Sequence, residues 1–159
     1  MTVIISIPRR IAERARREAE KLGLGLEEYV IELLTQDLDP RDRAIEYIEA
    51  AKELLEEARG ELEKDNVRQA AEKTWEAAAL TVKAYAWWRE SKRLTRHGEL
   101  WQYARKVAEE PGKWIDHAWN EANAMHICFY EGWCQKEQVE AALEQAEKLI
   151  KEIETKIKT

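Results

Sequence analysis

The chain has 159 residues, of which 45% are apolar and 36% are charged. A chain of this size can bury one core and carry a small appendage, and its aromatic content is too high for a disordered protein. No run of about 18 apolar residues is present, which excludes a transmembrane helix. The net charge of −6 argues against a protein whose whole surface binds nucleic acid.

The charge is distributed unevenly along the chain. Residues 1–23 and 83–106 carry net charges of +3 and +5, whereas residues 24–82 and 107–159 carry −9 and −5. Because the local field decides which ligands are attracted, the two basic segments keep nucleic acid among the possible ligands. The abundance of Glu, Lys and Arg is also typical of proteins from hot environments, that is, of thermophilic sources.

The number of cysteines indicates the cellular compartment of the protein. The only cysteines are Cys128 and Cys134, which are too few for a disulfide scaffold, and no secretory signal pattern opens the chain. We therefore expect a cytoplasmic protein with free thiols.

The first predicted element is a strand over Thr2–Pro8, with the β-branched sequence TVIISIP. A single strand cannot satisfy its own backbone, and its simplest partner is the same strand of a second subunit. A basic helix over Arg9–Leu22, stopped by Gly23, and a second short helix over about Leu26–Gln36 follow. Residues 1–38 are therefore predicted to form an arm that dimerises the protein.

This strand–helix–glycine–helix order, with LGLGLEEYVIELL as its second half, resembles the ribbon-helix-helix proteins. The resemblance implies paired strands that enter the major groove of DNA with outward side chains. Here the outward residues are Thr2, Ile4 and Ser6, and the strand contains no Lys or Arg. DNA binding and simple dimer formation both remain open as roles of the arm.

Residues 39–159 predict an all-α, up-and-down bundle of four to five helices. Asp39 as N-cap and Pro40 at the first helical position begin a long amphipathic helix, which is expected to break near Gly60–Lys64. Its apolar stripe consists of Ala44, Tyr47, Ile48, Ala51, Leu54, Leu55, Ala58 and Leu62.

A central helix follows, capped by Asp65 or Asn66. It is apolar on nearly all sides from Ala77 to Trp88, so neighbouring helices must cover it. Three further helices are predicted over Leu100–Glu109 (ended by Pro111 and Gly112), over Trp114–Tyr130, and from about Gln135, the last with a regular apolar seam.

A metal site is not expected from the histidines and cysteines. His117 and His126 are nine residues apart on one helix, which places them on opposite faces. No histidine is spaced to complete a zinc site with Cys128 and Cys134. We predict neither a metal nor another cofactor.

The Trp114–Tyr130 helix carries the first candidate site. Asp116, Asn123, His126 and Tyr130 form a polar row beside Trp119 at the edge of the apolar face, an arrangement typical of a small cleft. The alternative interpretation is a buried His126 that is satisfied by Asn123 or Tyr130 one turn away.

The basic segment 83–106 is the second candidate. Positive charges attract phosphates, and exposed aromatic rings stack on bases. We expect Arg89, Arg93, Arg96 and His97 to contact anions. In the alternative interpretation, the tryptophans are core anchors and the charges pair with glutamates of the first long helix. The segment interleaves Lys83, Arg89, Lys92, Arg93, Arg96, Arg105 and Lys106 with Tyr85, Trp87, Trp88, Trp101 and Tyr103.

The stretches QAAEKTWEAAALTVKAYAWW, RHGEL and AMHICFYEGW resemble the archaeal PaREP family, a branch of the HEPN helical-bundle superfamily. The resemblance covers the chain from about Pro40 to the end, and the beginning of the chain also looks like that of the family. It implies a dimerising bundle of four to five helices and an association with RNA or nucleotides. For the PaREP branch it implies no established activity.

Catalytic HEPN proteins are metal-independent ribonucleases with an Arg, four to six residues and then a His. Before His126 the permitted positions hold Trp119, Asn120 and Glu121, and neither of the other two histidines has an Arg at this spacing. The arginine that would stabilise the charge of the phosphorane is therefore missing.

We therefore expect a non-catalytic, dimeric HEPN-like binding module for RNA, a nucleotide or a partner protein, as in a toxin–antitoxin or stress-related pair. The first alternative is a DNA-binding regulator that acts through the ribbon-helix-helix-like arm. The second alternative is a metal-independent ribonuclease.

Overall fold

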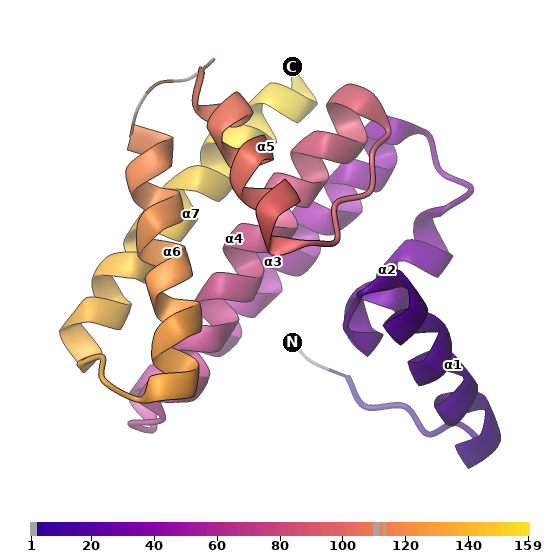
Figure 1. Cartoon of the computed structure of the whole chain (residues 1–159), viewed down its shortest axis with the longest axis horizontal. Helices are drawn as coiled ribbons and strands as arrows, with labels where there is room; N and C mark the ends of the chain where they lie inside the picture. The colour runs from indigo at the N-terminus through magenta and orange to yellow at the C-terminus, as the bar shows by residue number, and fades with distance from the viewer. Residues whose placement is uncertain (1–2, 110–111, 113) are drawn as a thin grey trace.

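The computed structural model describes residues 3–109, 112 and 114–159, and this part of the chain contains seven α-helices and no strand (Figure 1). The predicted all-α class is therefore confirmed. No helix within the described ranges combines the length and apolar content that crossing a membrane requires. The helices are α1 (Arg9–Leu22), α2 (Leu26–Thr35), α3 (Pro40–Glu63), α4 (Val67–Glu90), α5 (His97–Glu109), α6 (Trp114–Glu131) and α7 (Lys136–Lys158).

Helices α3 and α4 form the antiparallel centre of a bundle (Figure 1). Helix α7 packs against both of them, α6 packs against α4 and α7, and α5 covers α4 and α6. The arm stands at the side of this bundle, where α2 contacts α3 and α1 contacts α2 alone. The bundle thus contains α3 to α7.

Helix α4 is the core of the bundle, as its sequence predicts. Every residue from Ala77 to Trp87 is buried, so the helix is covered on all sides by its neighbours. Ala77 and Ala78 are fully inaccessible, and their small side chains let the adjacent helices approach closely. The predicted stripe of α3 is also buried except at Leu54, which is half-buried.

Both ends of α3 are as predicted. Asp39 caps the helix, since its carboxylate accepts a hydrogen bond from the Asp42 N–H at 3.0 Å. The helix ends at Glu63, within the predicted range Gly60–Lys64, and Gly60 lies in its last turn. A glycine inside a helix costs only about 1 kcal/mol, and burial of the flanking Ala58 and Leu62 outweighs it.

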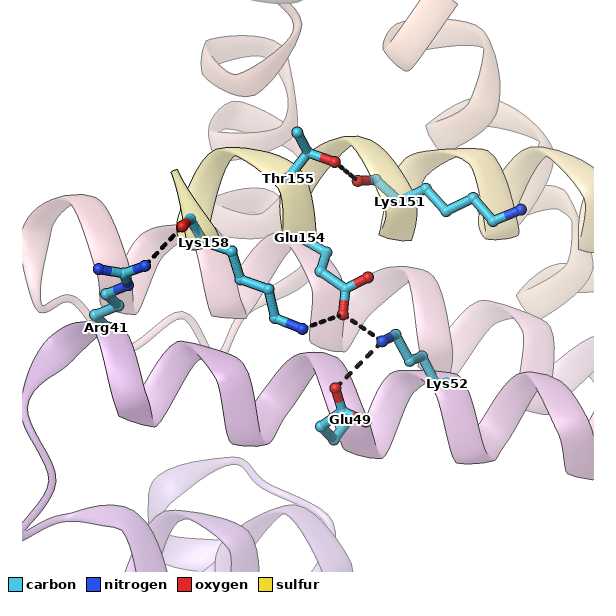
Figure 2. A network of polar contacts seen from close by, with 7 residues as sticks. All are labelled: Arg41, Glu49, Lys52, Lys151, Glu154, Thr155 and Lys158. Atoms are coloured by element: carbon cyan, nitrogen blue, oxygen red, sulfur yellow. Dashed lines mark hydrogen bonds and ion pairs between the residues drawn. The ribbon is translucent and has the colours of Figure 1, made fainter.

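Polar contacts join α3 to the end of α7 (Figure 2). Lys52 on α3 pairs with Glu154 on α7 and also lies 3.2 Å from Glu49. Glu154 in turn lies 3.0 Å from Lys158, and Arg41 donates to the Lys158 carbonyl at 2.7 Å. These contacts fix the last turns of α7 along α3.

The predicted strand is not present in the single chain. Within the predicted range, residues 3–8 have no regular secondary structure, and Thr2 lies outside the described residues. A strand requires a ladder partner, and the described part of the chain offers no second strand to residues 3–8. The expected pairing with a second subunit stays a prediction.

The expectation of free thiols is wrong, because Cys128 and Cys134 form a disulfide. Gly132, with a φ of 73°, ends α6 in the left-handed conformation that glycine adopts without strain. The chain then turns back and brings the two Cα atoms to 5.7 Å, within the usual range for a disulfide. The predicted helices already placed a turn between the two cysteines, but the spacing of six residues did not show that the thiols meet.

We expect reduction of this disulfide to lower the free energy of unfolding by roughly 2 kcal/mol, the chain-entropy value for so short a loop. Urea titrations with and without dithiothreitol measure the difference. A Cys128→Ser/Cys134→Ser variant is the control and should not respond to the reductant. Two reactive thiols in the unfolded, non-reduced protein would contradict the disulfide.

Candidate functional site

His126 on α6 is held by side chains of α4. Its Nδ1 lies 3.0 Å from the Glu72 carboxylate, and its ring stacks on Trp75 with centroids 5.0 Å apart. The edge of the Tyr130 ring is the third neighbour, at 5.2 Å between centroids. The structure therefore gives His126 a carboxylate partner from α4, whereas the sequence had suggested Asn123 or Tyr130.

The other residues of the predicted row lie in different environments. Trp119 is a core side chain, 5.1 Å from Trp75 and 5.9 Å from Trp101 between ring centroids. Its buried indole nitrogen has no hydrogen-bond partner among the described residues. Asp116 and Asn123 are half-buried, and the Tyr130 side chain is exposed. The structure thus brings His126 and Tyr130 into contact. Trp119 is linked to them only through Trp75, which contacts both His126 and Trp119.

Two cations of the basic segment are bound by glutamates of the arm. Arg93 donates from Nε to a Glu32 carboxylate oxygen at 2.8 Å and also from a terminal nitrogen. Lys83 on α4 pairs with Glu28, and both of these side chains are largely buried. Both glutamates belong to α2. The cations therefore pair with glutamates, as in the alternative interpretation of segment 83–106, but with those of α2 instead of the first long helix, α3.

The remaining cations of this segment are closer to the surface. The Arg89 guanidinium lies 5.4 Å from the centre of the Trp88 ring, and Lys106 pairs with Glu90 at 3.1 Å. Arg96 is exposed, and the side chain of His97 lies outside the described part of the structure. The aromatic residues are mainly core anchors, since Tyr85, Trp87 and Tyr103 are buried.

A cleft with a volume of about 1040 Å³ lies between the arm and the bundle. One wall is the start of α2, and the other consists of the face of α3 that carries Glu53, Glu57 and Glu61 and the adjoining face of α4. Leu26, Ile31 and Leu54 form apolar parts of the lining, and Trp75 brings the cleft next to His126. Its charged lining residues are Glu27, Glu28, Glu53, Glu57, Glu61, Glu76, Lys64, Lys73 and Lys83.

Glu76 shows the electrostatic effect of this lining. The pKa of its carboxyl group is raised from 4.5 to about 7, mainly by desolvation and also by the charges of Glu72 and Glu27, with a smaller contribution from Glu57. Lys73 acts in the opposite direction. The cleft therefore contains a surplus of negative charge that a cationic ligand would neutralise.

This cleft was not predicted from the sequence. The available signal was the spacing of Glu53, Glu57 and Glu61, which puts three carboxylates on one face of α3 beside its apolar stripe. On an isolated amphipathic helix this pattern indicates a solvated face. Only the position of α2 makes it one wall of a cleft.

The fold and its cleft define an all-α bundle protein with a helical arm and an acidic cleft between the two. Residues 46–150 match the family model described as the archaeal PaREP1/PaREP8 family. The match covers most of the chain, and the protein belongs to this family. The arm, residues 1–38, precedes the matched region. Neither the curated proteins nor the solved structures contain a match to this chain.

Proposed function

We propose that this protein is a non-catalytic, dimeric binding module for a partner protein, and that its bundle is HEPN-like. The observation that supports the proposal most is the apolar surface of the arm. Exposed apolar patches often mark a surface that binds another protein chain, and here a second copy of this chain is the partner that fits. The exposed large apolar residues of the arm are Val3, Ile4, Ile5, Ile7, Ile11, Val30, Leu33, Leu34 and Leu38.

Helix α2 has two faces with different partners. Glu28 and Glu32 face the bundle and bind its cations. Val30, Leu33 and Leu34 lie on the opposite side at helical spacing, and Leu34 is 75% exposed. An apolar face that this chain leaves uncovered suits a two-fold contact with the same face of a second copy.

The extended segment Val3–Ile7 supports the same interpretation. Ile4 is 92% exposed, and residues 3–7 have no strand partner in the described chain. Pairing with the same segment of a second copy satisfies the backbone and covers these side chains.

The pairing of the basic segment favours a protein partner over RNA or a nucleotide. Arg93 and Lys83 are bound to glutamates of α2, which leaves fewer cations for phosphates. The acidic lining of the cleft repels a polyanion. The missing arginine before His126 also argues against a ribonuclease of the HEPN type.

We expect a Val30→Asp/Leu34→Asp variant to be monomeric at micromolar concentrations at which the wild-type protein is a dimer, because charges on this face cannot be buried without partners. Sedimentation velocity measures the two species. Ile127→Asp on α6 is the matched control, since Ile127 and Val30 are 41% and 42% exposed. A monomeric wild-type protein, or a variant that dimerises like the control, contradicts the proposal.

DNA binding through the arm is the second candidate function. Helix α1 exposes five arginines next to the extended segment Val3–Pro8, and arginines that contact phosphates make binding strongly dependent on salt. Fluorescence anisotropy with labelled duplex DNA at low salt tests this function. Binding that is unchanged in an Arg10→Ala/Arg14→Ala variant would remove α1 from the interface.

A further inference from the structure

The acidic cleft and helix α1 have complementary charges. The cleft is lined by six glutamates and three lysines, a net charge of −3. Helix α1 contains six cations and three glutamates between Arg9 and Leu22, a net charge of +3. No other helix in the described part of the chain has so large a positive excess.

Helix α1 is also the element with the least cover in its own chain. It contacts only α2, and Figure 1 shows it projecting beside α2 and away from the bundle. Ala19 is its only fully buried residue, and Arg10, Ile11 and Arg14 are exposed. A second molecule can therefore contact most of its surface.

We propose that the basic helix α1 of a second copy lies in the acidic cleft, and that the two copies exchange this contact reciprocally. The inference rests on the proposed dimer and adds the contact that orients it. A two-fold axis makes the exchange symmetrical, because each chain supplies one basic helix and one cleft.

The apolar lining of the cleft fits the same occupant. Leu26, Ile31 and Leu54 offer apolar surface between the carboxylates. Helix α1 carries the exposed Ile11 among its arginines, so it can place an apolar side chain on this surface while its guanidinium groups meet the glutamates. Arginine suits this position because it is weakly hydrated and forms bidentate contacts with carboxylates.

Charge reversal on each side tests the contact. Glu27→Lys/Glu53→Lys changes both walls of the cleft at exposed positions, and Arg10→Glu/Arg14→Glu changes one face of α1. Each variant places like charges opposite each other, and we expect the dimer dissociation constant to rise roughly 10- to 100-fold. The variant with all four substitutions restores opposite charges and should regain dimerisation to within about threefold of wild type.

Glu140→Lys/Glu144→Lys is the matched control, since both residues are exposed on α7 and outside the cleft lining. Sedimentation equilibrium at low and high salt gives the dissociation constants. A cleft variant that dimerises like this control overturns the inference, and so does a four-substitution variant that stays dissociated. In either case the proposed function stands if Val30→Asp/Leu34→Asp still dissociates the dimer.

Discussion

Replacing Arg93 with alanine should lower the free energy of unfolding by about 2 to 4 kcal/mol. The Glu32 side chain that it binds is only 8% exposed, so the substitution leaves a buried carboxylate without its cation. Breaking one side of a fully buried pair costs about 3 to 5 kcal/mol, and we expect less here because the Arg93 side chain is 41% exposed. Urea unfolding followed by circular dichroism measures the change.

Two variants separate this pairing from a general effect of charge. Arg96→Ala removes an exposed cation three residues away and should change stability by less than about 0.5 kcal/mol. Glu32→Gln combined with Arg93→Ala removes both charges and should recover much of the loss. If Arg93→Ala is as stable as Arg96→Ala, Arg93 does not hold α2 against the bundle.

This result matters for any test of nucleic-acid binding. Arg93 and Arg96 are equivalent as phosphate contacts in the sequence, but in the structure Arg93 joins the arm to the bundle. A loss of nucleic-acid binding in an Arg93 variant therefore does not distinguish a lost phosphate contact from a displaced arm. Arg96→Ala is the informative substitution, because it removes a cation from the surface and no ion pair of the described structure involves it.

Much of the fold could be predicted because it depends on neighbours in sequence. The stripe that includes Tyr47 and Leu55 is buried because helical periodicity alone places its members on one face. The start of α3 was predictable for the same reason, because the capping residue Asp39 binds the N–H of Asp42, three residues further on. The end of α3 at Glu63, within the predicted range Gly60–Lys64, rests on the same local signals.

The site depends on contacts that are distant in sequence, and these could not be predicted. His126 and Glu72 are 54 residues apart, and Arg93 and Glu32 are 61 apart. Glu72 and His126 lie on different helices, and Arg93 lies in the connection between α4 and α5. Only the packing of α6 on α4 and of α2 beside the bundle brings each pair together. The acidic cleft is likewise a property of the arm and the bundle together.

Replacing Glu76 with glutamine should stabilise the protein at pH 8 by about 1 to 3 kcal/mol and have little effect at pH 5. The pKa of Glu76 is raised from 4.5 to about 7, mainly by desolvation. The folded protein therefore holds this proton more tightly than the unfolded chain. The resulting stabilisation is fully present below pH 4.5 and is lost as the pH rises through 7. At pH 8 the wild-type protein must keep a charged carboxylate in the cleft, and glutamine removes that cost.

Urea unfolding of both proteins between pH 5 and 8 measures this difference. Glu63→Gln on the exposed end of α3 is the control and should show no such pH dependence. A constant difference between Glu76→Gln and wild type over this range would contradict a raised pKa. Arginines of a second copy in the cleft would favour the charged carboxylate. The stabilisation by Glu76→Gln at pH 8 should therefore shrink at protein concentrations where the dimer predominates.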